Sequence, residues 1–273
     1  MNANFVSFEN KSVLIVGGAS GMGRACGLLM NSLGAHLSVL DVAAVDYPVK
    51  QYFKVDLRSQ ASVDDVLAQL EERFDVVLSC AGVADGTGGI MQINFISQRY
   101  IIENLLANNK LSEQASVVLI SSIAGLPWQQ NLAQLKDFLS TASWQEAESW
   151  LKNHQGNDTY TFSKQAANAY VASSALRLLS KGVRINSILP GPTDTPLARA
   201  NADVWLGFGH GYREAAGIEY LIPEQMASVM AFLASPAASG VSGVLLPVDA
   251  GHMSSAITDS YPEPAIKMML GLS

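Results

Sequence analysis

The sequence predicts an α/β fold built on one doubly wound parallel sheet of about seven strands. Short β-branched segments alternate along the chain with stretches of helical periodicity, which is the pattern of parallel strands joined by crossover helices. The strand segments are nearly continuous apolar runs, as expected when helices cover both faces of a sheet. No internal repeat, low-complexity segment or linker interrupts the 273 residues, so we expect a single domain over residues 1–273.

The expected strands follow from apolar, β-branched runs that end at small or turn-forming residues. In chain order they are Ser12–Gly17, His36–Asp41, Tyr52–Val55, Phe74–Cys80, Ala115–Ser121, Arg184–Leu189 and Val244–Val248. A helix should run from Gly21 to Leu33 and stop at Gly34, and a second should end near Arg73. A long helical stretch separates the fourth and fifth strands.

Composition and charge exclude several kinds of partner. The net charge is −7 and the pI about 5.0, so the sequence lacks the basic patch that nucleic acid or an anionic membrane requires. The segment Met1–Lys11 has no apolar core of a signal peptide, and no apolar run is long enough to cross a bilayer. Cys26 and Cys80 in apolar surroundings are typical of a reducing compartment, and the four dispersed histidines lack metal-ligand spacing. We expect a cytoplasmic protein without a metal and without nucleic acid or membrane partners.

The segment 126–157 breaks the strand–helix alternation. It holds three of the four tryptophans. Ser143 and Glu146 have the spacing of a capping box, in which Ser143 caps a helix and Glu146 reaches back to it. Trp144 and Ala147 fall on the apolar face of that helix. We therefore expect a helical insertion between a strand and the next long helix.

A glycine-rich loop follows the first strand directly and opens the first helix. Gly17, Gly21 and Gly23 form a GxxxGxG pattern, which lets the backbone approach a pyrophosphate held by the helix N-terminus; a tight turn without a ligand is the alternative. Asp41 ends the second strand, where an acid would bind adenosine ribose hydroxyls, unless it only caps the next loop. A carboxylate there would repel a 2′-phosphate, and the stretch from the first glycine to this aspartate contains no lysine and no arginine other than Arg24. The sheet is thus expected to be Rossmann-like and to bind NAD rather than NADP.

Tyr160 and Lys164 lie four residues apart at the start of a predicted helix, so their side chains share one face. A free tyrosine has a pKa of about 10 and is a poor base at neutral pH. A nearby ammonium group favours the phenolate, as does the positive charge of an oxidised nicotinamide. The pair therefore predicts a general acid/base whose pKa is lowered by its surroundings.

With these features the sequence resembles the short-chain dehydrogenase/reductase family over nearly its whole length. The motifs of that family occur here as Gly17-Gly18-Ala19-Ser20-Gly21-Met22-Gly23, Asp56-Leu57, Cys80-Ala81-Gly82, Asn94, Ser122, Tyr160 with Lys164, and Pro190-Gly191-Pro192-Thr193-Asp194-Thr195. Cys80 replaces the usual asparagine, and Val16 replaces a threonine before the first glycine. These departures concern loop packing and leave the chemistry intact.

The resemblance implies roles for the matching residues. Tyr160 would be the general acid/base, and Ser122 would hydrogen-bond the same substrate oxygen. Lys164 would hold the nicotinamide ribose and lower the pKa of Tyr160, and Asn94 would anchor a water on the proton path. Strand alternation directs Ser121 away from Ser122, and the family pattern favours Ser122. The implied cofactor contacts are Gly17, Ser20, Gly21, Met22, Gly23, Asp41, Asp56, Leu57, Cys80, Ala81, Gly82, Tyr160, Lys164, Pro190, Gly191, Thr193 and Thr195.

The long insertion is similar to that of the bacterial 3α-hydroxysteroid dehydrogenase/carbonyl reductase branch of the family. The usual subunit contact of the family uses the helices around this insertion, which could block the common tetramer. We expect a homodimer or a homotetramer. For the insertion itself, the alternative is an extra flap that packs on its own core and has no role.

A substrate lid is expected at about residues 195–215, because Trp205, Phe208 and Tyr212 stand there among three glycines. An ordinary surface helix is the alternative. The expected activity is that of an NAD-dependent alcohol dehydrogenase or ketone reductase acting on a bulky hydrophobic secondary alcohol, such as a hydroxysteroid, terpenoid or aryl carbinol. Dehydrogenation of a smaller cyclic diol or an acyl thioester is the runner-up, and a catalytically silent NAD(H)-binding sensor is the alternative from another class.

Overall fold

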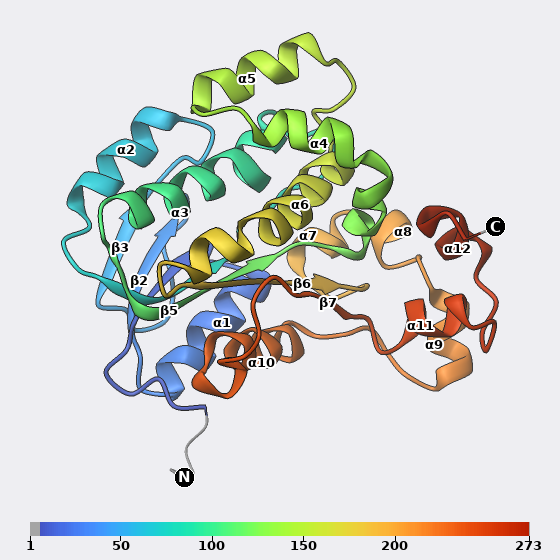
Figure 1. Ribbon diagram of the computed structural model, residues 1–273. Helices are drawn as coiled ribbons and strands as arrows, with labels where there is room; N and C mark the ends of the chain where they lie inside the picture. The colour runs from blue at the N-terminus through green and yellow to red at the C-terminus, as the bar shows by residue number, and fades with distance from the viewer. Residues whose placement is uncertain (1–5, 273) are drawn as a thin grey trace.

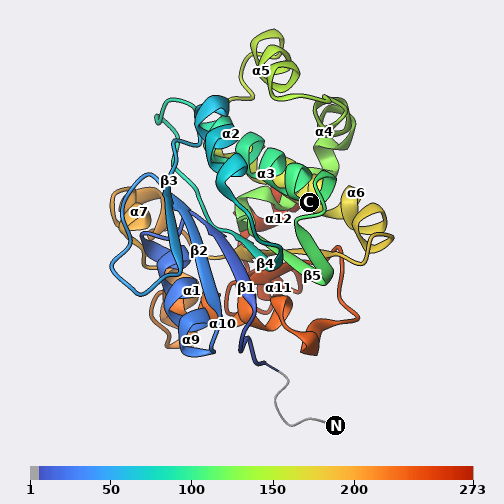
Figure 2. The ribbon, with the colours of Figure 1, turned by 90° about the vertical axis from the view of Figure 1, so that its left-hand side faces the viewer.

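The computed structural model describes residues 6–272 and contains a seven-stranded parallel sheet in the order β3-β2-β1-β4-β5-β6-β7 (Figures 1 and 2). The predicted fold class is therefore confirmed. The strands are β1 (Ser12–Val16), β2 (His36–Asp41), β3 (Gln51–Lys54), β4 (Phe74–Ser79), β5 (Leu111–Ile120), β6 (Arg184–Pro190) and β7 (Leu245–Val248).

Strand β5 begins four residues earlier than the apolar pattern predicts. Its first part is polar, and Gln114 has a positive φ of 64°. The register against β4 shifts there, because Phe74 pairs with Leu111 whereas Val76 pairs with Ser116. A β-bulge of this kind depends on the partner strand and leaves no period-2 signal in the sequence.

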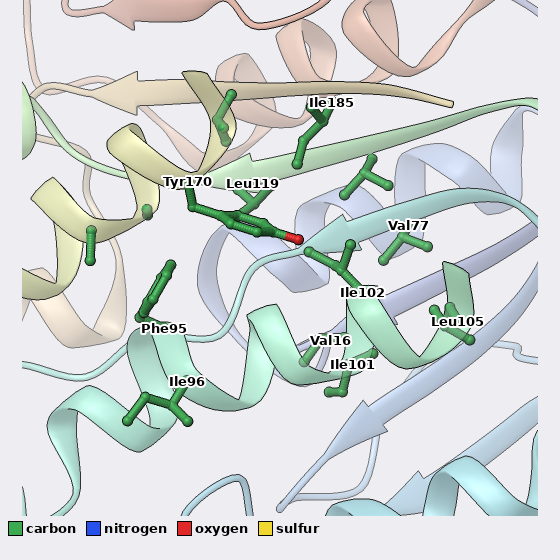
Figure 3. Close-up of a cluster of buried hydrophobic side chains, with 14 of the residues drawn as sticks. Val16, Val77, Phe95, Ile96, Ile101, Ile102, Leu105, Leu119, Tyr170 and Ile185 are labelled. Atoms are coloured by element: carbon green, nitrogen blue, oxygen red, sulfur yellow. The ribbon is translucent and has the colours of Figure 1, made fainter. Parts of the chain in front are cut away.

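Helices cover both faces of the sheet (Figure 1), and the side chains of β1 divide between two core clusters, with Leu14 and Val16 in one and Val13 and Ile15 in the other. On one face α1 (Gly21–Ser32) and α10 (Pro223–Ala234) pack together over the side chains of Val13 and Ile15. On the other face lie α2 (Gln60–Gln69), α3 (Ser97–Ala107) and α6 (Tyr160–Leu179). Figure 3 shows the second layer, where side chains of α3 and Tyr170 of α6 meet Val16, Val77, Leu119 and Ile185 of the strands. Within residues 6–272, none of the helices combines the length and apolarity needed to span a membrane.

Two helical segments differ in detail from the prediction. Helix α2 ends at Gln69 rather than near Arg73, because Leu70 is fully buried and already extended (ψ 104°) as the chain turns into β4. The stretch before α3 begins with a π-helical turn, η1 (Gln92–Ile96). A π-turn widens the helix locally and is often found at functional sites.

The insertion forms the 3₁₀ segment η2 (Ile123–Asn131), α4 (Leu132–Leu139) and α5 (Trp144–Asn153). The Ser143 hydroxyl caps α5 by accepting from the Glu146 N–H at 3.1 Å, as predicted. The return contact is shifted by one residue, since the Glu146 carboxylate accepts from the Ala142 N–H at 2.7 Å and not from Ser143.

Helices α4 and α5 lie above α3 and α6 in Figure 2 and share their core. The Phe138 ring lies 5.7 Å from Phe95, 4.9 Å from Trp150 and 5.6 Å from Phe162, measured between centroids. Trp144 meets Tyr100 of α3 edge-on. The insertion therefore packs on the main core rather than forming a flap with a core of its own.

The chain after β6 forms short helices beside the carboxyl ends of the strands, on the right in Figure 1. Between β6 and α10 these helices are α7 (Pro196–Arg199), α8 (Ala202–Trp205) and α9 (His210–Ala216). After α10 the chain forms the 3₁₀ helix η3 (Pro236–Ala238) and strand β7, and it ends with α11 (His252–Ile257) and α12 (Pro264–Leu270). The last helix returns to the insertion, because the Gln130 side chain donates to the Met269 carbonyl at 3.0 Å.

Candidate active site

One cavity of about 600 Å³ opens at the carboxyl ends of strands β1 to β6. Ligands of open α/β sheets bind at this edge. Every residue that the sequence predicts to contact a cofactor lines this cavity, and so do Ser122, Tyr160 and Lys164. Asn94 is the one predicted site residue that does not.

The glycine loop is packed so closely that side chains cannot enter it. A Cβ on Gly23 would lie 1.8 Å from the Gly17 carbonyl oxygen, and a Cβ on Gly17 would lie 2.5 Å from the Ala81 backbone. Ser20 precedes α1, and its side chain makes no capping hydrogen bond with the first amides of the helix. Gly21, Met22 and Gly23 present that helix start to the cavity. Such a cradle fits a pyrophosphate group.

Asp41 links the glycine loop to the loop after β2. Its Oδ2 accepts from the Ala19 N–H at 2.8 Å, and its Oδ1 accepts from the Ala43 N–H at 3.0 Å. The loop-capping alternative is thus realised, and the same carboxylate also lines the cavity. Asp41 can cap the loops and also accept a hydrogen bond from a ligand, because each carboxylate oxygen carries two lone pairs.

Asp56 is paired with a cation that the sequence analysis did not include. Arg58 contacts its carboxylate at 2.7 Å, which lowers the pKa of Asp56, and Arg58 also lines the cavity. The two-residue spacing of an acid and a base on a loop is too common to have identified this pair from the sequence.

Tyr160 and Lys164 occupy the first two turns of α6. Thr159 caps this helix by accepting from the Phe162 N–H at 3.2 Å, which sets where α6 begins. The Lys164 Nζ lies 5.4 Å from the centroid of the Tyr160 ring and donates to the Ile120 carbonyl oxygen at 3.0 Å. The end of β5 is thereby joined to the helix that carries the tyrosine.

The two adjacent serines after β5 point to different partners. The Ser121 side chain is buried and donates to the Lys164 carbonyl at 3.1 Å. The Ser122 hydroxyl accepts from the Ala124 N–H at 3.1 Å and lies near enough to the Tyr160 phenol to lower the pKa of that group. Ser122 is therefore the serine that meets the tyrosine, in agreement with the alternation of the strand.

The pKa of Tyr160 is the main correction to the sequence analysis. Burial raises it to about 12, and the charge of Asp85 acts in the same direction, whereas the hydrogen bond from Ser122 lowers it. Burial also lowers the pKa of Lys164 from 10.5 to about 8. The expectation that Lys164 lowers the pKa of Tyr160 is not met by the protein groups alone, because desolvation outweighs the favourable contacts.

Asn94 lies behind the cavity wall on the π-turn η1. Its Oδ1 accepts from the Val83 N–H at 2.8 Å, and its Nδ2 donates to the Val83 carbonyl and to the Ser163 hydroxyl. The amide thus holds the loop after β4 against α6. Gly82 separates it from Lys164, since a Cβ there would lie within 4 Å of both side chains.

The predicted lid and the C-terminal helix line the other end of the cavity. The Trp205 ring lies 4.8 Å from that of Tyr160, and Val204 and Phe208 continue the apolar wall. Met269 of α12 completes it, a contribution that no motif in the sequence indicated. The same segment also packs against the C-terminal part of the chain, where the Tyr212 ring stacks on that of His252.

Comparisons with known proteins agree with this site. The family model described as Enoyl-(Acyl carrier protein) reductase matches residues 17–253. The chain is 30% identical over 248 residues to the 3-alpha-hydroxysteroid dehydrogenase/carbonyl reductase of Comamonas testosteroni, covering 88% of this chain and 96% of that protein. It is 26% identical over 259 residues to the coniferyl-alcohol dehydrogenase of a Pseudomonas species, covering 92% and 100%.

A solved structure is similar as well. The 3-alpha-hydroxysteroid dehydrogenase from Pseudomonas sp. B-0831, complexed with NADH, superposes with a TM-score of 0.72 at 25% identity, covering 92% of this chain and all of that one. The chain belongs to the short-chain dehydrogenase/reductase family, as the motifs predicted. It is accordingly an oxidoreductase with a nicotinamide cofactor.

Proposed function

We propose that the protein is an NAD(H)-dependent dehydrogenase/reductase that interconverts a bulky hydrophobic secondary alcohol and its ketone. The observation that carries this proposal is the meeting of Ser122 and Tyr160 in a cavity that the glycine loop closes at one end and apolar side chains close at the other. Bound in this cavity, the nicotinamide would accept or donate the hydride.

The tyrosine supplies the proton. In the reducing direction the Tyr160 hydroxyl donates its proton to the substrate oxygen while the Ser122 hydroxyl hydrogen-bonds the same oxygen. With a pKa of about 12, the phenol holds its proton at neutral pH and is ready to donate it. Alcohol oxidation needs the deprotonated form, so its rate should rise with pH above neutrality.

The remaining residues hold and orient the cofactor. The amides of the glycine loop would bind the pyrophosphate, and Lys164 and Thr195 would hold the nicotinamide half. Thr195 is well placed for this because it is buried and fixed by its own capping bond to the Ala198 N–H at 3.1 Å. Asn94 would act indirectly, by positioning the loop beside Lys164.

The preference for NAD over NADP rests on Asp41. Its carboxylate lies on the cavity wall at the end of β2, where it can accept from ribose hydroxyls and repels a 2′-phosphate. Asp41→Asn keeps one oxygen for a backbone N–H and removes the charge. The ratio of kcat/KM with NAD+ to that with NADP+ should fall by about tenfold or more. An unchanged ratio would assign cofactor choice to other residues.

The substrate class follows from the apolar wall. Val204, Trp205, Phe208 and Met269 line the same cavity as Tyr160, and the Trp205 ring lies 4.8 Å from the tyrosine ring. The relatives reported above are named for coniferyl alcohol and for 3α-hydroxysteroids, which are aromatic and polycyclic alcohols. A bulky ring system would bury this surface, whereas a small diol would leave most of it in contact with water.

The direct test is turnover of nicotinamide with a panel of secondary alcohols and their ketones. Hydroxysteroids, monoterpenols, aryl carbinols and small diols would be compared, with Tyr160→Phe and with Tyr220→Phe as a matched control outside the cavity. Turnover of a bulky alcohol that Tyr160→Phe abolishes and Tyr220→Phe preserves would support the proposal. NAD+ binding without turnover of any substrate would favour a silent NAD(H)-binding sensor, and turnover restricted to small diols would favour the runner-up.

We also propose a homo-oligomer whose contacts avoid the first half of α6. Residues 162–171 of that helix are buried within the subunit, partly under the insertion. The second half leaves Leu176 81% and Leu179 52% exposed. Analytical ultracentrifugation of wild type and Leu176→Glu tests this, since a dimer through this face would weaken and a dimer elsewhere would not.

A further inference from the structure

Among the described residues 6–272, Asp85 is the one acidic side chain near Tyr160 on the cavity wall that the reaction above does not use. Of the other charged residues on the cavity wall, Asp41, Asp56 and Arg58 lie on the loops after β2 and β3, and Lys164 is buried against Ile120. Asp85 is exposed and belongs to the loop after β4, which runs on through Gly86 and Gly88. A carboxylate at this position favours ligands that carry a hydrogen-bond donor or a positive charge over ligands that carry a carboxylate.

One oxygen of this carboxylate has a fixed position. The Asp85 Oδ1 accepts from the backbone N–H of Tyr160 at 2.7 Å. This is the first amide of a 20-residue helix, where a negative charge is favourable. The carboxylate therefore lies one tyrosine side chain away from the phenol that exchanges the proton.

The second oxygen is available to a ligand. No hydrogen bond to Asp85 Oδ2 comes from any group in residues 6–272, and Asp85 forms no ion pair there. Neighbouring atoms leave the loop tip open, because a Cβ on Gly86 or Gly88 would meet nothing within 4 Å. A substrate that reaches Tyr160 with its reacting oxygen and extends along the tyrosine side chain brings its far end to this carboxylate.

We propose that Asp85 determines substrate specificity: its free carboxylate oxygen accepts a hydrogen bond from a second donor of the substrate and repels substrates that carry a carboxylate. This inference rests on the proposed alcohol/ketone activity and narrows it. The preferred class is an alcohol or ketone on a ring system that carries a hydroxyl, phenol or ammonium group about one six-membered ring away from the reacting carbon.

The same carboxylate acts on the tyrosine. The negative charge of Asp85 helps to raise the pKa of Tyr160, so the charge stabilises the protonated phenol. Removing the charge should move the pH dependence of alcohol oxidation towards lower pH. A residue that only supported the loop would leave this pH dependence in place.

The test compares acetophenones that differ only at the 4-position, with binding measured in the NAD+ complex and turnover measured as reduction by NADH. The substituents are hydrogen, hydroxyl, aminomethyl and carboxylate, and calorimetry measures Kd for each in the presence of NAD+. Asp85→Asn keeps an amide oxygen for the Tyr160 N–H and removes the charge. The matched control is Asp158→Asn, which removes an acid that accepts from the Met91 N–H near the same helix end but does not line the cavity.

We expect wild type and Asp158→Asn to bind the aminomethyl compound about tenfold or more tightly than the carboxylate, and Asp85→Asn to lose most of that ratio. The oxidation profile of the corresponding alcohols should shift only in Asp85→Asn. An unchanged ratio in Asp85→Asn, or no binding of any compound to wild type, would overturn the inference. Selective binding without turnover would instead refute the proposed reaction and leave the role of Asp85 supported.

Discussion

The buried ammonium group of Lys164 should destabilise the folded protein, and replacing it should therefore stabilise the fold while abolishing the function. The side chain is only 3% exposed, and burial lowers its pKa from 10.5 to about 8. Because one pH unit corresponds to about 1.4 kcal/mol, keeping this lysine charged in the folded state costs about 3 kcal/mol at pH 7. Loss of its hydrogen bond to Ile120 in Lys164→Met costs about 1 kcal/mol. The variant should gain about 2 kcal/mol.

The difference in stability between Lys164→Met and wild type should depend on pH. Between pH 8 and 10.5 the unfolded chain holds the lysine proton and the folded chain does not, so the stability of wild type rises with pH. Lys164→Met lacks this contribution. Its advantage should therefore be largest at pH 7 and shrink by about 2 kcal/mol by pH 10.

Urea unfolding of wild type, Lys164→Met and the exposed-site control Lys181→Met at pH 7, 8.5 and 10 provides the measurement. The control should follow wild type at every pH. A difference between wild type and Lys164→Met that stays constant with pH would show that Lys164 is not held in a desolvated site. If Lys164→Met were less stable than wild type at pH 7, the desolvation cost assigned to Lys164 would be refuted.

Two further predictions concern the C-terminal segment and the insertion. Burial lowers the pKa of His252 below 6.5, so the unfolded chain binds its proton more readily and stability should fall as the pH drops below about 6.5. His252→Phe, which keeps the ring against Tyr212, should flatten that fall in urea titrations at pH 7.5 and 5.5, and an equally steep fall would contradict this cause. Phe138→Ala should lower the free energy of unfolding by about 3–4 kcal/mol in a single transition, because its ring joins α4 to Phe95 and Phe162. A separate early transition, with most of the stability retained, would show that the insertion unfolds on its own.

Local sequence patterns predicted the sheet well because each parallel strand is buried on both faces. Runs such as Val13–Val16 are apolar at every position, and the structure sends alternate residues to the α1 and α3 layers. The apolar pattern missed a strand segment that forms because of its pairing with a neighbouring strand. The polar start of β5 becomes a strand because Leu111 pairs with Phe74, and a bulge at Gln114 then shifts the register so that Ser116 pairs with Val76.

The candidate site was predictable to the extent that its geometry is local. The glycine spacing, the capped start of α6 and the four-residue step from Tyr160 to Lys164 each lie within a few residues of sequence. The placement of Asp85 on the Tyr160 amide joins positions 75 residues apart, and nothing in the sequence around Asp85 signals it. The contribution of Met269 depends likewise on the return of α12 to Gln130.

The sequence by itself determined the fold class, the family and the motif residues on the cavity wall, since these follow from periodicity and short motifs whose physics is local. The tertiary structure decided the pKa values in the cavity and the positions of Asp85 and Met269 on its wall. The pKa of Tyr160 is set by burial, by Ser122 and by Asp85, groups that only folding brings together. Desolvation and long-range charge depend on what surrounds a side chain in space, and that information is absent from the order of residues along the chain.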